Sequence, residues 1–183
     1  MNTTSFIRLA APILALTALA SCSSGVHNFA GNLGPEGRAV IASGGNVRLC
    51  SLDGQKPVKN GACFPMSFKG NTTLQVTPGR HRVGVSYYWQ PASLMFADAL
   101  QNASVNQFSG PTVRPGTQVM RGFVSTTTPI LEINAKAGHV YTLMEERTGK
   151  RWRVYVKDSH GGQSKTDRSH AVEGAMRMDT QVF

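Results

Sequence analysis

Apolar and polar residues alternate along most of this chain, which is the period of strands with one buried face. The stretch LQVTPGRHRVGVSYYW, which begins at Leu74, alternates on both sides of Pro78-Gly79. A Pro-Gly pair between two alternating runs is a turn signal. The pattern therefore predicts a hairpin that directs Leu74, Val83 and Val85 toward the core.

Several later segments follow the same rule. The region 130–158 contains turn signals at Lys136-Ala137-Gly138 and at Thr148-Gly149. Shorter strand candidates occur earlier, at 39–42 and 47–52. Alternation divides the last strand of the later region into an inward apolar set and an outward basic set: Trp152, Val154 and Val156 against Arg151, Arg153 and Lys157.

Short strands with turns at intervals of roughly eight to twelve residues favour an all-β domain, either an antiparallel β-sandwich of the immunoglobulin type or a small barrel. We place this domain at residues 38–158. Residues 91–118, rich in Pro, Gly and Asn, are expected to form a long loop insertion with a helical turn or two at 94–100. Residues 159–183 offer few apolar anchors, so we expect a partly disordered tail.

The first 21 residues have a different pattern. Arg8 precedes an apolar run from Leu9 to Ala20. This run is shorter than the roughly 20 residues that a membrane-spanning helix needs. A charged residue followed by a short apolar segment is typical of a signal peptide.

The apolar run ends in Leu19-Ala20-Ser21-Cys22, which resembles the lipobox of bacterial lipoproteins. The resemblance implies cleavage before Cys22, a diacylglyceryl group on its thiol and acylation, for example with palmitate, of the new amino terminus. A plain signal peptide that happens to end at a cysteine is the alternative. Ser23 stands where Asp would imply inner-membrane retention, so the resemblance implies a periplasm-facing protein anchored in the outer membrane. Residues 22–37, rich in Ser, Gly and Asn, are expected to be a flexible tether.

Two cysteines remain after cleavage, Cys50 and Cys63. In the oxidising compartment that a signal peptide implies, such a pair favours a disulfide. A metal site would need further ligands nearby, and the sequence has no His between residues 28 and 80. We therefore predict a Cys50–Cys63 bridge and no metal.

A second, weaker resemblance covers about a quarter of the chain. The region 44–88 is similar to the PEGA-type small β modules of bacterial envelope proteins, in which a strand ends in Asp-Gly and a later hairpin contains Pro-Gly-x-His-x-Val. The longer segment between the two motifs, and Cys63 within it, depart from that pattern. The matching positions imply structural roles and no catalytic one: Asp53, Gly54, Pro78, Gly79, His81 and Val83.

No enzymatic motif is visible in the sequence. A Ser nucleophile elbow and the paired His spacing of zinc enzymes are both missing, and the adjacent Glu145 and Glu146 point to opposite faces if they lie on a strand. We therefore predict a non-enzymatic protein without a cofactor. Nucleic acid is a poor candidate partner because a secreted, anchored chain seldom meets it.

The chain has a formal net charge of +9, and its Lys and Arg residues are dispersed. Two hypotheses follow. The first is an accessory lipoprotein that binds or assembles with another envelope protein through a sheet edge, a basic face or residues 91–118. The second is direct binding of an anionic envelope ligand, such as lipid headgroups, lipopolysaccharide or peptidoglycan. The candidate residues for a basic face are Arg80, Arg82, Arg151, Arg153 and Lys157.

Overall fold

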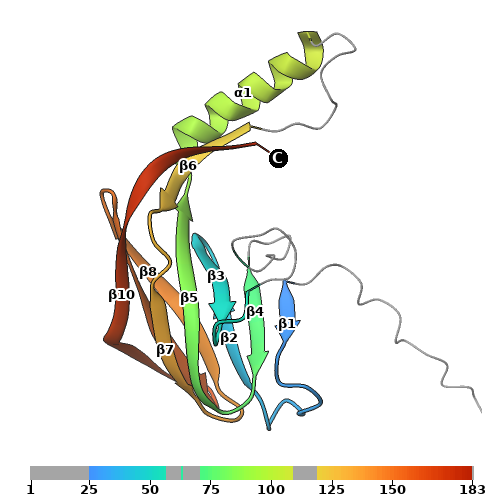
Figure 1. Cartoon of the computed structure of the whole chain (residues 1–183), viewed down its shortest axis with the longest axis vertical. Coiled ribbons are helices and arrows are strands. Elements are labelled where there is room, and N and C mark those ends of the chain that lie inside the picture. The colour runs from blue at the N-terminus through green and yellow to red at the C-terminus, as the bar shows by residue number, and fades with distance from the viewer. Residues whose placement is uncertain (1–24, 57–62, 64–70, 109–118, 183) are drawn as a thin grey trace, which may run out of the picture.

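The computed structural model describes residues 25–56, 63, 71–108 and 119–182. Its strands form one sheet in the order β1-β4-β2-β8-β9-β10-β6-β5-β3, with β7 also paired to β5 (Figure 1). The elements are β1 (Val26–Asn28), β2 (Ala39–Ser43), β3 (Val47–Leu52), β4 (Thr72–Val76), β5 (Gly79–Trp89), α1 (Ala92–Phe108), β6 (Val119–Ser125), β7 (Ile130–Ala135), β8 (Val140–Thr148), β9 (Arg151–His160) and β10 (Gln163–Val182).

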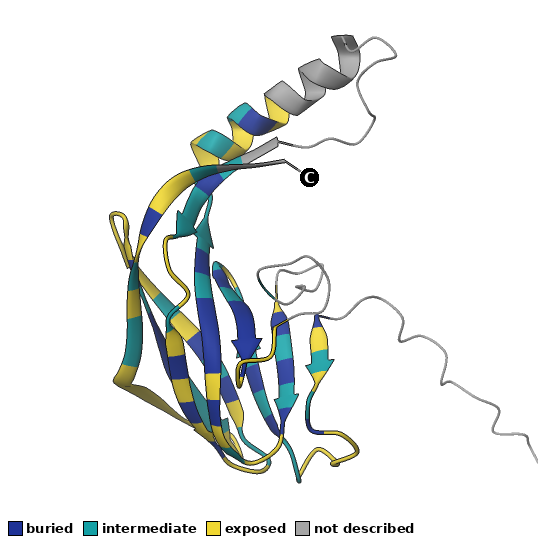
Figure 2. Cartoon of the chain, viewed as in Figure 1, coloured by how far each residue is buried: buried dark blue, intermediate teal, exposed yellow. Residues whose placement is uncertain are grey.

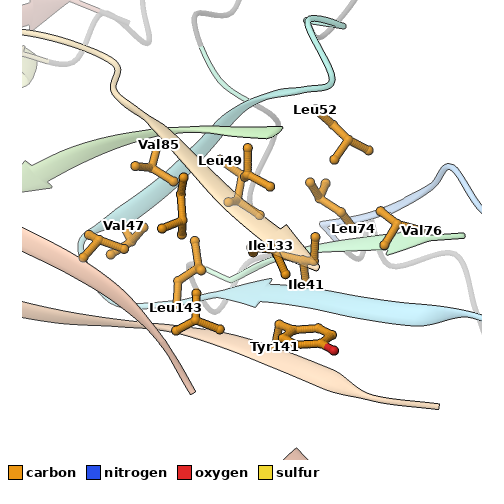
Figure 3. Packing of buried hydrophobic residues seen from close by; sticks show 14 of the residues in the cluster. Ile41, Val47, Leu49, Leu52, Leu74, Val76, Val85, Ile133, Tyr141 and Leu143 are labelled. Carbon is orange, nitrogen blue, oxygen red and sulfur yellow. The ribbon is translucent and has the colours of Figure 1, made fainter. Parts of the chain in front are cut away.

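The sheet curls into a half-barrel, so that its two flanks face each other across one core (Figures 1 and 3). This confirms the prediction of an all-β, barrel-like protein. The antiparallel sandwich is not confirmed, because β1 pairs with β4 and β2 pairs with β8 in parallel.

The core is built by the alternation that the sequence shows. Val83, Val85 and Tyr87 on β5 are buried, as are Trp152 and Val154 on β9. Each fully buried Val, Leu or Ile contributes about 1.5–3 kcal/mol relative to exposure. Figure 3 shows the closely packed side chains contributed by both flanks, among them Ile41, Leu74, Tyr141 and Leu143 opposite Val47, Leu49, Val85 and Ile133.

An aromatic stack joins the flanks. The rings of Tyr87 and Trp152 lie 5.8 Å apart between centroids and 8° from parallel. Gly174 on β10 gives the indole its space, because a Cβ there would lie 2.6 Å from ring atoms of Trp152. The stack therefore fixes β5, β9 and β10 relative to one another.

The prediction of a hairpin around Pro78-Gly79 is wrong, because the two strands beside this turn do not pair with each other. Both strands exist, but β4 pairs with β1 and β2, whereas β5 pairs with β3, β6 and β7. The turn is a corner at which the chain crosses from one flank to the other. Gly79 has φ +140°, a conformation that favours glycine. A local turn signal does not reveal whether the strands on either side bond to each other.

The region 91–118 is more helical than expected. Residues 92–108 form the single helix α1, which contains no Gly or Pro and is rich in Ala and Leu. It packs against β6 at one end of the half-barrel (Figure 1). Residues 109–118 of the predicted loop lie outside the described residues.

The predicted disordered tail is instead the long strand β10. Its first part pairs with β9 and its last part with β6. The side chains of 163–170 are all exposed (Figure 2), which is why the apolar pattern gave no strand signal. Backbone pairing to β9, after the Gly161-Gly162 turn, holds this segment in place.

Part of the segment 22–37, predicted to be a flexible tether, is instead a strand. Val26–Asn28 form β1 beside β4, and Ala30 is buried. The signal segment and Cys22 lie outside the described residues. No helix in the described part of the chain is both long and apolar enough to cross a membrane.

The Cys50–Cys63 disulfide is confirmed. Cys50 is buried on β3, which ends the sheet order. The bridge therefore ties residue 63 to the outermost strand of one flank.

Candidate functional site

A groove of about 550 Å³ lies between β7 and the β9–β10 hairpin. Its floor is formed by the buried side chains of Ile133, Tyr141 and Val156. Its walls are polar and carry both signs of charge: Arg80, Glu132, Asn134, Lys136, Asp158, Lys165, Asp167 and His170.

The path of β10 creates this groove. Near its middle, β10 leaves β9 and joins β6 (Figure 1). At that point the backbone N–H and the hydroxyl of Thr126 both donate to the carbonyl oxygen of Ala175, at 3.0 and 3.2 Å, which joins β10 to the segment that follows β6. Toward the Gly161-Gly162 turn, β10 pairs with β9 on one edge only among the described residues.

Each carboxylate of the groove has a partner. Glu132 forms an ion pair with Arg80. The hydrogen bond and the charge of Arg80 hold the pKa of the Glu132 carboxyl below its usual value. Asp158 lies 2.8 Å from Nδ1 of His139.

The third carboxylate organises an irregular part of β10. Asp167 accepts hydrogen bonds from the hydroxyl and the backbone N–H of Ser169, at 2.6 and 2.8 Å. These bonds lower the pKa of Asp167. They stabilise the shift in register between Asp167 and Val172, which directs His170 into the groove.

Two cations of the groove, unlike its carboxylates, have no ion-pair partner among the described residues. Within the described part of the chain, the side chains of Lys136 and Lys165 take part in no ion pair. In the same groove, the Tyr141 hydroxyl accepts from the backbone N–H of Lys136 at 2.9 Å and donates to the Asn134 carbonyl at 3.3 Å. Burial raises the pKa of Tyr141. The groove therefore offers two ammonium groups to an occupant.

A second hollow, of about 230 Å³, adjoins the groove and shares Asp158 and Lys165 with it. The rings of His139 and His160 stack here, 4.3 Å apart between centroids. His160 Nδ1 lies 3.2 Å from the Gly138 carbonyl oxygen. No group of three or more metal-binding side chains occurs among the residues that the structure describes.

The five residues predicted to form a basic face do not meet. Arg151, Arg153 and Lys157 alternate with core residues of β9, so they point outward from that flank. Arg80 and Arg82 alternate with buried His81 and Val83, so they point outward from the flank of β5. Because Tyr87 of β5 stacks on Trp152 of β9 across the core, the two sets lie on opposite outer faces.

Two of these cations are also already neutralised. Arg80 pairs with Glu132, and Arg153 lies 3.4 Å from Glu173. Of the five, only Arg80 lines the groove. The fold therefore does not bring these five residues together into a single positive patch.

The Asp-Gly and Pro-Gly-x-His motifs form one structural contact. His81 is buried, with Nδ1 2.7 Å from an Asp53 oxygen and Nε2 2.7 Å from the Thr77 carbonyl oxygen. The other Asp53 oxygen accepts from the backbone N–H of Arg82 at 2.7 Å. The contact closes the corner between β3 and β5, and both nitrogens of the His81 ring are occupied by it.

Sequence reasoning missed Lys136, Lys165 and Tyr141 as site residues. Their assembly depends on strand pairing between distant segments, and no local motif marks it. Comparison with known proteins does not supply a site either, since no family model, no curated protein and no solved structure matches this chain.

Proposed function

We propose that this protein is a non-enzymatic binding or assembly module of the bacterial envelope, anchored by lipid to the outer membrane and facing the periplasm. The observation that supports binding is the groove between β7 and the β9–β10 hairpin, which combines an apolar floor with charged walls. Its occupant is another envelope protein.

The lipobox resemblance supports the anchor. With Cys22 acylated, only three residues separate it from β1, which begins at Val26. A fully extended chain spans at most about 3.6 Å per residue, so β1 would lie within about 15 Å of the bilayer surface. Two or three acyl chains hold a protein at a membrane far more firmly than one.

The Asp53–His81 contact supports the finer proposal of a PEGA-like module, because it joins the two motifs of that resemblance. The two facing flanks likewise support a sandwich-like description of the body. In both cases the residues concerned are structural, which is consistent with a scaffold that presents its binding groove elsewhere.

Direct binding of an anionic envelope ligand is the second candidate. The charge of the chain favours it, but the separation of Arg80 and Arg82 from Arg151, Arg153 and Lys157 does not. A triple Arg151→Gln, Arg153→Gln, Lys157→Gln variant tests this candidate. Weaker association of the folded variant with anionic vesicles or lipopolysaccharide, most clearly at low salt, would favour it.

The anchor is tested by labelling cells with radioactive palmitate. Wild-type protein should take up label and fractionate with the outer membrane, whereas Cys22→Ser should stay unlabelled and unprocessed or soluble. Label on Cys22→Ser at the wild-type level contradicts the proposed lipidation.

The binding function is tested by capturing partners of the full lipidated chain from solubilised envelopes. A protein retained reproducibly, and lost when the groove is altered by the exposed substitutions Lys136→Glu and Lys165→Glu, supports the proposal. The triple basic-face variant is the matched control. Retention of no protein by the wild-type chain would contradict the binding-module proposal.

A further inference from the structure

We propose that the groove binds an extended, acidic peptide segment of the partner as an additional β-strand between β7 and β10. This inference rests on the proposed binding function and specifies its partner. It follows from the backbone edges that border the groove and from the charges beside them.

The edge of β7 that faces the groove pairs with no other strand in the described structure. On its other edge β7 pairs with β5, its one strand partner in the described structure. The Asn134 carbonyl and the Lys136 N–H both turn toward Tyr141, away from β5. Because successive residues direct their backbone groups to opposite edges, Ile130 and Glu132 present theirs in the same direction as Asn134.

β10 provides the opposite edge. The Gly161-Gly162 turn has φ values of +56° and +81°, which are typical of a two-residue hairpin turn. In such a turn the two flanking residues, His160 and Gln163, form a hydrogen-bonded pair. Hydrogen-bonded and non-hydrogen-bonded pairs alternate along an antiparallel ladder, so the pairs two and four residues further along β10 are hydrogen-bonded to β9 as well. Ser164 and Thr166 therefore direct their N–H and C=O groups away from β9.

The two edges run in opposite directions. β6 and β7 are both antiparallel to β5, and β10 is antiparallel to β6. A strand inserted between β7 and β10 is therefore parallel to one of them and antiparallel to the other. Open strand edges readily accept such a strand, and its main-chain hydrogen bonds provide the affinity.

The side chains select the kind of peptide. Glu132, Asp158 and Asp167 are already paired within the protein, whereas Lys136 and Lys165 have no ion-pair partner among the described residues. A bound peptide with Asp or Glu facing these ammonium groups gains charge-assisted hydrogen bonds. The apolar floor of Ile133, Tyr141 and Val156 accommodates β-branched side chains.

The test selects peptides of about ten residues, enough to cover the edge of β7, from a random phage-displayed library on the full chain. We expect sequences with alternating β-branched residues and at least one Asp or Glu. No enrichment, or enrichment of sequences without this acidic character, would overturn the proposal.

Paired variants then separate backbone from side-chain effects. Glu132→Pro removes the N–H that faces the groove, whereas Glu132→Ala removes only the side chain. Loss of one backbone hydrogen bond predicts affinity about tenfold lower for Glu132→Pro than for Glu132→Ala. Thr166→Pro and Thr166→Ala repeat the comparison on β10, in case Glu132→Pro does not fold. Equal affinity within the folded pair contradicts strand addition.

Charge is tested by the double variant Lys136→Gln, Lys165→Gln. It should bind the selected peptides more weakly and with a smaller dependence on salt, while Arg151→Gln, Arg177→Gln, which removes the same charge elsewhere, should bind as the wild type does. Equal losses in both double variants would overturn the role of the groove cations.

The failure of the strand inference and the failure of the binding function can be told apart. If a natural partner is captured but its binding is unchanged by Glu132→Pro, the strand inference fails while the binding function stands. If the peptides bind in the groove but no natural partner is captured, the binding function fails instead.

Discussion

The body of the half-barrel and the arm at one end of it are stabilised in different ways. The body contains β2–β5 and β7–β9, whose inner faces meet in the apolar core. The arm consists of α1, β6 and the last part of β10, which extend beyond most of that core (Figure 1), although Met176 of β10 belongs to the core and Phe123 of β6 packs against it. In the body, alternating apolar residues are almost completely buried, whereas in the arm a polar contact fixes the helix.

That polar contact is centred on Asp98, the one charged residue of α1. Asp98 is only 3% exposed and accepts hydrogen bonds from the backbone N–H and Nε of Arg121 on β6, at 2.7 and 2.6 Å. On the opposite side of the helix, Phe96 and Leu100 are 74% and 72% exposed. We therefore expect local opening of the arm to cost less free energy than opening of the body.

The two tryptophans report on the two regions separately. Trp152 lies in the body against Tyr87. Trp89 lies where the arm begins, stacked on Phe123 of β6 at 5.3 Å between ring centroids and covered by the Arg147 guanidinium at 3.8 Å. Variants with one tryptophan, Trp89→Phe or Trp152→Phe, therefore make the comparison measurable by fluorescence.

The largest expected effect is that of Trp152→Ala. It removes a fully buried indole and leaves a cavity, which costs about 3–5 kcal/mol of the free energy of unfolding. Chemical denaturation should show a loss of this size, or no folded protein. Arg151→Ala, the exposed neighbour on the same strand, should change stability little. A loss below about 1 kcal/mol for Trp152→Ala would contradict the assignment of the core.

The second prediction concerns the disulfide, which is attached to the body. Closing a loop of this size contributes about 3 kcal/mol in the chain-entropy model. Reduction, or the double variant Cys50→Ala, Cys63→Ala, should lower the melting temperature of the body reported by Trp152. Two reactive thiols counted on the denatured, unreduced protein would show that the bridge is not formed.

Sequence patterns predicted the body better than the arm. Alternation correctly identified the inward positions of β5 and β9, because burial against the opposite flank is what selects apolar residues there. Outside both regions, it missed the first part of β10, whose exposed side chains are held by backbone pairing to β9. It also underestimated α1, because Asp98 replaces the apolar stripe that usually marks a helix packed on a sheet.

The groove could not be predicted for a related reason. Lys136 and Lys165 line the same groove because the pairings of β7 with β5 and of β10 with β6, both between segments distant in the sequence, place β7 and β10 on either side of it. The Pro78-Gly79 signal illustrates the limit, since it correctly located a turn but not the partners of its strands. Individual faces can be predicted from local sequence, whereas strand order cannot.

The third prediction is that Asp98→Ala loosens the arm and leaves the body intact. The variant removes every acceptor for the backbone N–H and guanidinium of Arg121 at this site. Hydrogen exchange should become faster in 92–100 and 119–125, with Trp89 fluorescence changed and Trp152 fluorescence retained. Glu173→Ala, which removes an exposed partner of Arg153, is the control. Simultaneous loss of both tryptophan signals would show that the arm and the body unfold as one unit.

The smallest effect is a dependence on acid pH that also separates the two regions. The backbone hydrogen bond and the charge of Arg121 outweigh desolvation and lower the pKa of Asp98. At Asp53 in the body, burial acts to raise the pKa but is outweighed by hydrogen bonds from Arg82 and His81, so the net shift is also downward. A carboxyl with a lowered folded-state pKa stabilises the protein above its unfolded pKa of about 3.9, and that contribution is lost as the pH falls through the folded value.

The loss of stability at acid pH should be larger in the arm than in the body. The Asp98 side chain in the arm is 4% exposed, whereas the Asp53 side chain in the body is 43% exposed and screened by solvent. Below about pH 4 the Trp89 signal should therefore change before the Trp152 signal does. Asp98→Asn, which has no titrating carboxyl, should abolish the early change of Trp89, whereas Asp53→Asn should leave it in place. The order of the two fluorescence signals decides the comparison. If the Trp152 signal changes first, the arm is not the region held by a titrating carboxylate. The same conclusion follows if both signals change together in the wild type and in Asp98→Asn.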